Sequence, residues 1–169
     1  MDTIETILTR RSIRKYTDEK VTKNDITDLL RAAMAAPSAN NCMPWHFVVL
    51  KDHKIMDKIP QFHPYSKMLT EASAAILVCI DKKLESADGY GIQDCSAATQ
   101  NILLAAHAKG LGAVWLGIYP RQMRVSRMRE LLNIPETVLP LSLVAIGYAN
   151  EKKMAANRFN EKRVHYNKW

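Results

Sequence analysis

An apolar run at residues 74–80, Ala-Ala-Ile-Leu-Val-Cys-Ile, constrains the fold of this 169-residue chain more than any other segment. A run this short and this apolar is typical of a strand that is buried on both faces. Residues 46–50, 114–116 and 141–147 predict further strands, the first of them also buried. Because a sheet with two buried faces needs helices on each side, we expect a three-layer α+β or α/β domain with about four strands.

Helical spacing of apolar residues predicts the layers that cover this sheet. The clearest case is the segment 26–34, where apolar residues recur at a period of about 3.6. Thr22 is placed to cap this helix, and Asp25 lies in its first turn. Further helices are expected at residues 2–10, 52–59 and 121–132, the last stopped by Pro135.

Residues 92–108 predict a long apolar helix that is rich in alanine. Gly110 follows this helix and is a usual helix terminator. Because small side chains permit close packing, the helix is either the central core helix or a subunit interface.

The last segment, residues 150–169, is polar and basic, with aromatic residues at 159, 166 and 169. It has too little apolar content to fold alone, so it either frays or lies on another surface. We see no internal repeat or linker, and expect residues 1–169 to form a single domain with this segment as a C-terminal tail.

The cysteine and histidine patterns exclude several classes of protein. Three cysteines with no C-x-x-C pair argue against a disulfide framework and a zinc site, and the five histidines lack metal-ligand spacing, so we expect no metal. No signal peptide is visible, and no apolar run approaches the roughly 20 residues that span a bilayer. We therefore expect a cytoplasmic protein without a membrane partner.

The formal net charge of +7 suits the steering of anionic ligands or contact with nucleic acid. The basic residues are dispersed over residues 10–15, 121–129 and 152–168, and no helix-turn-helix, zinc-finger or RRM pattern accompanies them. We expect no nucleic-acid partner, while a basic nucleic-acid-binding domain stays as one alternative.

Common catalytic motifs are missing from the sequence. The pair Gly110-x-Gly112 lacks the third glycine and the preceding strand of a dinucleotide-binding motif, so we expect no Rossmann site. Cys42 could be a nucleophile, but no charged neighbour in sequence would activate its thiol. We interpret it as a passive loop residue.

Residues 10–14, Arg-Arg-Ser-Ile-Arg, place three guanidiniums and one hydroxyl within five positions. The run leaves an expected helix and enters an extended stretch, where backbone N–H groups are free to point outward. Arginine forks and free amides together suit a cluster of phosphate oxygens. The alternative is a solvated charged surface.

A second polar stretch, residues 37–45, reads Pro-Ser-Ala-Asn-Asn-Cys-Met-Pro-Trp. Pro37 ends the preceding helix, and the small polar residues after it are turn formers that offer donors and acceptors close to the backbone. The stretch is either a binding loop or simply the start of the strand at 46–50.

Together, the two stretches resemble the FMN-dependent nitroreductase family, whose pattern is R-x-S-x-R followed by P-S-x-x-N-x-Q-P-W. The matching positions are Arg10, Ser12, Arg14, Pro37, Ser38, Asn41, Pro44 and Trp45. Met43 departs from the pattern, which usually has glutamine there, and a thioether is a poor substitute for an amide in hydrogen bonding. The resemblance continues through residues 94–106 and 110–117 to Arg158 and residues 164–169, and so covers nearly the whole chain.

The resemblance implies a nitroreductase-like α+β fold, with a mixed, largely antiparallel sheet of roughly four or five strands between helical layers. It implies a short-form NAD(P)H:FMN oxidoreductase, in which the flavin carries the chemistry at N5 and no side chain is catalytic. A ping-pong hydride transfer would reduce nitroaromatics or quinones. A non-catalytic flavin-binding protein is the other alternative, and the sequence names neither the acceptor nor the preferred nicotinamide.

The resemblance also assigns cofactor contacts. Arg10, Arg11 and Arg158 would neutralise the FMN phosphate, and Ser12 would bind the phosphate or the ribityl chain. Arg14 would lie near the N1–O2 edge of the flavin, where a cation stabilises the anionic hydroquinone.

The remaining implied contacts concern the ring, the substrate and a second copy of the chain. The ring would meet the loop residues Pro37, Ser38, Ala39 and Asn41, and the backbone at Leu116 and Gly117, where a side chain would hinder close approach. Candidate substrate contacts are Phe62, Tyr65 and Lys67, for which a plain surface loop is the alternative. The family implies a homodimer with FMN at the subunit interface, and residues 150–169 would then pack on the partner.

Overall fold

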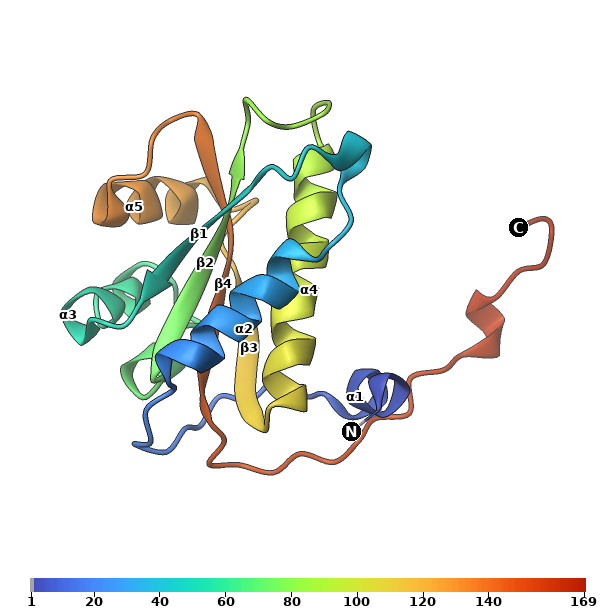
Figure 1. Cartoon of the computed structure of the whole chain (residues 1–169), viewed down its shortest axis with the longest axis horizontal. Helices are drawn as coiled ribbons and strands as arrows, with labels where there is room; N and C mark the ends of the chain where they lie inside the picture. Colours follow the sequence, from blue (N-terminus) through green and yellow to red (C-terminus); the bar gives the residue numbers. More distant parts are fainter. Residues whose placement is uncertain (1) are drawn as a thin grey trace.

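The computed structural model describes residues 2–169 and contains, within them, one four-stranded sheet with helices on both faces (Figure 1). The strands are β1 (Trp45–Leu50), β2 (Ala74–Asp81), β3 (Leu111–Gly117) and β4 (Val138–Tyr148). Their order is β1-β2-β4-β3, and each neighbouring pair is antiparallel. The three-layer α+β prediction is confirmed, and the α/β alternative is wrong because no two of these strands form a parallel pair.

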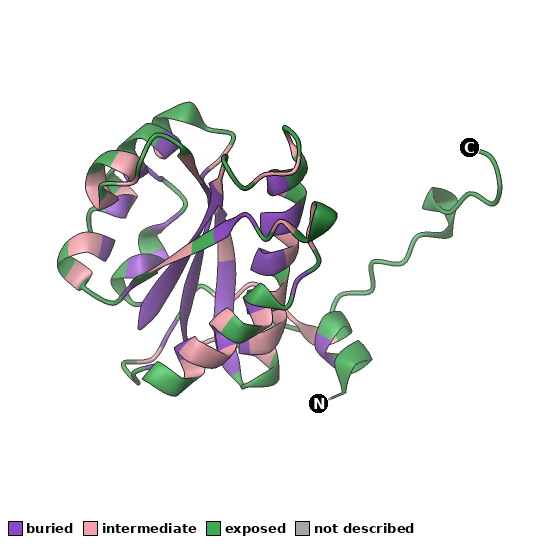
Figure 2. Ribbon diagram, turned by 45° about the horizontal axis from the view of Figure 1, so that its top comes forward, coloured by how far each residue is buried: buried purple, intermediate pink, exposed green. Residues whose placement is uncertain are grey.

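Helices α2 (Lys23–Met34) and α4 (Tyr90–Ala108) cover one face of the sheet, and α3 (His53–Met56) and α5 (Gln122–Leu132) cover the other (Figure 1). The central strand β2 divides its side chains between the two cores. Ile76 and Val78 face the first core, whereas Leu77 and Cys79 face the second. This alternation of fully buried apolar residues explains the uninterrupted run at 74–80 (Figure 2).

Local sequence signals explain where α2 begins. The hydroxyl of Thr22 accepts a hydrogen bond of 3.0 Å from the N–H of Asp25, and the Asp25 carboxylate accepts one of 3.1 Å from the N–H of Thr22. This reciprocal capping box contributes about 1 kcal/mol to helix stability and confirms the expected start of the helix.

Helix α4 is the central core helix of the chain. Its buried residues include Cys95, Ala98 and Ile102, and the Thr99 hydroxyl lies 2.8 Å from that of Ser142 on β4. Gly110 follows the helix with a φ of +77°, a left-handed conformation that glycine adopts without strain.

The structure differs from the predictions in the burial of one strand and in the ends of two helices. The strand at 46–50 is half-exposed, because β1 is an edge strand that pairs with β2 alone. The helix expected at 52–59 is shortened to His53–Met56, followed by a 3-10 turn at Ile59–Gln61. Helix α5 ends because Asn133 adopts a left-handed φ of 52°, two residues before Pro135.

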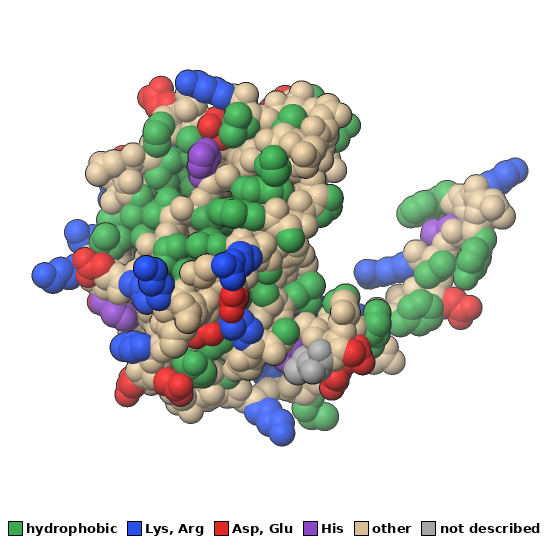
Figure 3. Space-filling model, in the orientation of Figure 1, with side chains coloured by type: hydrophobic (Ala, Val, Ile, Leu, Met, Phe, Trp, Pro, Cys, Tyr) green, Lys and Arg blue, Asp and Glu red, His purple; other side chains and the backbone are tan. Residues whose placement is uncertain are grey.

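The C-terminal tail leaves the body of the molecule after β4, and residues 152–169 are exposed (Figures 1 and 2). It carries both basic and large apolar side chains away from the body, as Figure 3 shows. The short helix α1 (Thr3–Thr9) lies beside the point where the tail departs, and its Ile4 and Leu8 are exposed. Within residues 2–169, no helix combines the length and apolarity needed to cross a membrane.

Candidate functional site

The arginine-rich run is held against the outer edge of β3. Helix α1 ends at Arg10, whose φ of −52° and ψ of 131° are no longer helical. Ser12 then forms a parallel bridge with Ala113, and the N–H of Ile13 donates to the carbonyl of Ala113 at 3.0 Å. The run therefore is extended, as expected, and its backbone is anchored at its middle.

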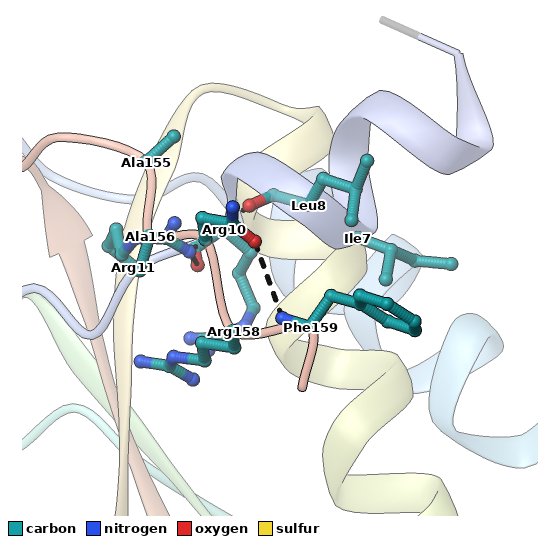
Figure 4. Close-up of a pocket in the computed structure, with 9 residues that line it drawn as sticks. Ile7, Leu8, Arg10, Arg11, Ala155, Ala156, Arg158 and Phe159 are labelled. Carbon is teal, nitrogen blue, oxygen red and sulfur yellow. Dashed lines mark hydrogen bonds between the residues drawn. The ribbon is translucent and has the colours of Figure 1, made fainter. Parts of the chain in front are cut away.

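Three arginines meet around one cavity of about 500 Å³ (cavity 1; Figure 4). Arg10 and Arg11 come from the run and Arg158 from the tail, while Ile7, Leu8 and Phe159 supply apolar lining. None of the described residues that line the cavity is acidic. Burial, followed by the nearby charges of Arg11 and Arg158, lowers the pKa of Arg10, as expected where like charges gather.

Arg11 is the most constrained of these side chains. Its Nε donates to the carbonyl of Met154, and its Nη1 donates to the carbonyls of Leu8 and Arg10. Its Nη2 is buried and has no hydrogen-bond partner within residues 2–169. An unpaired buried donor is costly, and Arg11 lines cavity 1, where a bound anion would be the kind of partner that this nitrogen lacks. Arg10 and Arg11 are thus partly buried, whereas Arg14 is exposed, as a solvated charged surface would also have it.

Ser12 links the arginine-rich run to the C-terminal tail through its backbone, since its carbonyl accepts a hydrogen bond of 2.7 Å from Lys153 Nζ. Lys153 also forms an ion pair of 3.2 Å with Glu151, whose carboxylate accepts from the N–H of Arg14. The start of the tail is thus tied to the arginine-rich run on both sides of Ile13.

A second cavity of about 400 Å³ lies at the other end of the run (cavity 2). It collects five of the predicted residues from three separate segments: Arg14, Tyr65, Lys67, Leu116 and Gly117. Within residues 2–169, the Arg14 guanidinium and the Lys67 ammonium have no charged or hydrogen-bonded partner, and no acidic residue lines the cavity. Trp115 and Met68 add apolar surface, so the cavity suits a flat, apolar group with an electronegative edge.

Gly117 leaves cavity 2 open. A Cβ atom built on it would meet only the carbonyl oxygen of Tyr119, at an ordinary 3.8 Å. The packing of the chain itself therefore does not require glycine at this position, which lines cavity 2.

Phe62 lies apart from the other two candidate substrate contacts. It lines a different cavity, with Arg127 and Leu131 of α5, and packs partly buried against the second core. Tyr65 and Lys67, only a few positions further on, point into cavity 2 instead.

The second polar stretch lies at the opposite edge of the sheet. It leads into β1, whereas the arginine-rich run lies along β3, and neither cavity is lined by Pro37, Ser38, Ala39 or Asn41. Figure 1 shows the loop near the first turns of α4, far from α1. One chain therefore does not bring the two stretches together.

The loop itself is built more tightly than a simple strand start. Asp94 of α4 accepts a hydrogen bond of 3.0 Å from the N–H of Ala39, and the Ser38 hydroxyl accepts one of 3.0 Å from the N–H of Met43. Asn40, Asn41 and Met43 all have positive φ angles. Such backbone conformations are costly for residues other than glycine and are common in ligand-binding loops. Cys42 has only a weak contact of 4.0 Å from its sulfur to the Asn40 carbonyl.

Sequence reasoning missed two residues, His63 and Arg124. His63 lines cavity 2, and Arg124 lies behind it, with its guanidinium 5.8 Å from the centre of the Tyr65 ring. The only feature of the sequence that could have pointed to His63 is its position between Phe62 and Tyr65, two expected substrate contacts. Arg124 had none, because it lies in a helix with many charged residues.

Comparison with known proteins identifies the family. The model of the nitroreductase family matches residues 7–63 and 61–148. This chain belongs to the nitroreductase family. The matched region includes the arginine-rich run, the loop at 37–45 and the residues of cavity 2, while Arg158 lies beyond it.

Three similar proteins match this chain over nearly its whole length. A protein of Methanothermobacter thermautotrophicus, named "Putative NADH dehydrogenase/NAD(P)H nitroreductase", is 49% identical over 100% of this chain and 88% of its own length. A crystal structure of a protein of the same name from Parabacteroides distasonis is 42% identical, with a TM-score of 0.95 over 99% of this chain and 98% of that one. An FMN-dependent nitroreductase from Clostridium difficile is 32% identical, with a TM-score of 0.91 over 99% and 100% of the two chains.

The described residues, 2–169, contain no group of three or more His, Cys, Asp or Glu side chains placed to hold a metal ion.

Proposed function

We propose that this nitroreductase-family protein is an FMN-dependent NAD(P)H oxidoreductase that reduces electron-poor acceptors such as nitroaromatics or quinones. The observation that carries this proposal is the pair of cavities at the two ends of the arginine-rich run. Arg10 lines one and Arg14 the other. Over a fully extended chain these residues would be roughly 13 Å apart. A ligand with a phosphate at one end and a flat ring at the other suits this arrangement, and the Clostridium difficile relative is named for FMN.

The residues present fit such a cofactor chemically. The buried, unpartnered Nη2 of Arg11 and the cluster of Arg10 with Arg158 would hold a phosphate that is close to doubly negative. Arg14 and Lys67 would supply positive charge at the ring, and the open space at Gly117 would admit it.

When bound, FMN supplies the redox chemistry, accepting a hydride from the nicotinamide and passing electrons to the acceptor. The part of the protein is to position the ring and to favour its reduced form. Arg14 and Lys67 would do this because fixed cations favour a site that gains negative charge. Tyr65, on the exposed side of cavity 2, would contact the nicotinamide or the acceptor.

We further propose that the active form is a homodimer with FMN between the two copies. Pro37, Ser38, Ala39 and Asn41 lie away from both cavities of their own chain, so the second copy would supply them. Residues 150–169 would pack on the partner, because a lone chain exposes large apolar side chains there, including a fully exposed Trp169. Ile4 and Leu8 of α1 would be covered at the same interface.

We also propose a cytoplasmic location. Cys42, Cys79 and Cys95 are all free thiols. Unpaired cysteines are usual in a compartment that keeps thiols reduced.

The deciding experiment is a flavin and turnover assay on the purified full-length protein. We expect yellow protein that releases FMN on denaturation, whose flavin absorbance is bleached by NADH or NADPH without oxygen and restored by a nitroaromatic or quinone. Protein that binds no FMN even after incubation with an excess would reject the proposal. Flavin that is bound but never reduced by either nicotinamide would indicate the alternative, a non-catalytic flavin-binding protein. Sedimentation of the same sample tests the dimer.

A further inference from the structure

At the wall of cavity 2, the side chains of His63 and Arg124 converge on one backbone carbonyl. His63 Nε2 lies 3.1 Å from the carbonyl oxygen of Gly117, and Arg124 Nη1 lies 2.8 Å from the same oxygen. Arg124 Nη1 is also 3.3 Å from His63 Nε2. His63 comes from the loop between two 3-10 turns, and Arg124 from the start of α5. Elements far apart in sequence therefore fasten the last residue of β3.

The donor chemistry of this cluster allows two arrangements. Arginine only donates, and Nη1 carries two hydrogens, so it can donate to Gly117 and to an unprotonated His63 Nε2. If Nε2 instead carries the proton, the Gly117 carbonyl accepts from both side chains. The first arrangement needs a neutral imidazole, whereas the second is compatible with either charge state, and in both Nδ1 has no hydrogen-bond partner within residues 2–169. Burial and the adjacent charge of Arg124 lower the pKa of His63, which keeps it neutral at neutral pH.

The same two side chains support the exposed wall of the cavity. The Arg124 guanidinium lies 5.8 Å from the centre of the Tyr65 ring, and the His63 ring meets Tyr65 edge-on at 6.4 Å. Tyr65 is 72% exposed, so these contacts limit the positions open to an otherwise free side chain. Within residues 2–169, no carboxylate forms an ion pair with Arg124, and its charge is not neutralised.

We propose that Arg124 and His63 are positioning residues that hold the Gly117 backbone and the Tyr65 ring for the flavin, and that Arg124 adds a fixed positive charge behind cavity 2 that favours the reduced cofactor. This inference rests on the proposed FMN-dependent function. It assigns two roles to one side chain, which can be separated because lysine keeps the charge of arginine but not its fork of donors.

Three variants and one matched control test the proposal: Arg124→Met, Arg124→Lys, His63→Gln and the control Arg127→Met. Arg127 lies on the same helix, but its exposed side chain pairs with Glu130 at 2.8 Å. For each protein the measurements are the FMN dissociation constant by fluorescence quenching, the visible spectrum and the midpoint potential of bound FMN, and the thermal unfolding temperature.

Arg124→Met should weaken FMN binding roughly tenfold, because the Gly117 backbone and the Tyr65 ring lose the side chain that holds them, and should make the midpoint potential more negative. Arg124→Lys should restore the potential but only part of the affinity. His63→Gln should weaken binding with little change in potential, since it alters no charge. Arg127→Met should match the wild type in all three flavin measurements.

Wild-type affinity, spectrum and potential in Arg124→Met would overturn the proposal, as would equal losses in Arg127→Met. If Arg124→Met does not fold, Arg124→Lys and His63→Gln decide, and wild-type affinity in both overturns the proposal. Wild-type protein that binds no FMN would reject the proposed function itself, whereas normal binding with unaffected variants would reject only this inference.

Discussion

Ile13 and Ala113 are joined by a hydrogen bond of 3.0 Å from the N–H of the first to the carbonyl of the second. It ties the extended stretch after α1 to the middle of β3. Because Arg10 precedes this contact and Arg14 follows it, the two side chains reach different cavities at one sheet edge. The same contact brings Arg14 to the cavity that Gly117, at the end of β3, also lines.

Substitution by alanine should lower the unfolding free energy at one glycine of β3 and leave it nearly unchanged at another. A Cβ on Gly112 would lie 2.7 Å from Ile13 Cγ2, so Gly112→Ala should cost about 1–3 kcal/mol of unfolding free energy and displace the arginine-rich run. Gly117→Ala should change that free energy by less than about 1 kcal/mol, because its Cβ meets nothing closer than 3.8 Å. It should nevertheless weaken FMN binding, since Gly117 lines cavity 2 and an added methyl group would crowd a ring bound against it.

Urea unfolding without flavin, followed by FMN titration of each variant, checks both expectations. Gly117→Ala with wild-type FMN affinity would contradict the assignment of cavity 2 to the ring.

Arg10→Met should separate binding from stability in cavity 1. The phosphate would lose one charged partner, so FMN affinity should fall by a factor of ten or more, on the order of one charge-assisted hydrogen bond. The flavin-free protein should be as stable as the wild type or more so, because repulsion with Arg11 and Arg158 is relieved. Arg31→Met is the control, since Arg31 is exposed and pairs only loosely with Asp28 at 3.6 Å. Equal loss of affinity in both variants would show that overall charge, and not cavity 1, governs binding.

Acid should destabilise the protein through His107. Its Nε2 lies 2.9 Å from the Thr9 hydroxyl, and burial, followed by the charges of Arg10 and Arg11, lowers its pKa. Since the folded pKa is below the unfolded value of about 6.5, the unfolded state binds the proton more readily. The associated stability is fully present above pH of about 6.5 and is lost as pH falls through the folded pKa.

His107→Gln should therefore flatten the dependence of unfolding free energy on pH below about pH 6.5. His63 has a lowered pKa too, so the difference between wild type and variant is the quantity to follow. Parallel pH curves for the two proteins would exclude His107 as the source.

Removing residues 154–169 should convert the proposed dimer to a monomer and abolish tight FMN binding. The shortened chain loses the Met154 carbonyl that accepts from Arg11 but keeps the contacts of Glu151 and Lys153 with the arginine-rich run, so its own fold should survive. Arg158→Met is the matched variant, which should lose FMN affinity and remain a dimer. Sedimentation velocity with FMN titration distinguishes the two, and a truncated protein that stays dimeric would place the interface elsewhere.

The elements predicted best from the sequence are those whose signals are local. The run at 74–80 is buried on both faces because every residue in it is apolar, and α2 begins where the pair Thr22 and Asp25 can cap it. The strand at 46–50 was predicted correctly, but its predicted burial was wrong. Whether a strand lies at the edge or in the centre of a sheet depends on the order of the strands, which its own residues do not encode. The helix at 52–59 failed for a related reason, since a turn around Pro60 replaced its second half.

The sequence by itself determined the layers of the fold and an extended run of arginines suited to bind a phosphate, because periodicity and side-chain chemistry reside in neighbouring positions. The expected contacts with a ring came from the family resemblance. Only the tertiary structure decided where those residues meet. It divided the run between two cavities, joined Tyr65 and Lys67 to Gly117 while sending Phe62 elsewhere, and added His63 and Arg124. It also put the loop at 37–45 on the opposite edge, because the order β1-β2-β4-β3 separates β1 from β3. Such convergence depends on contacts between distant segments, which no local pattern specifies.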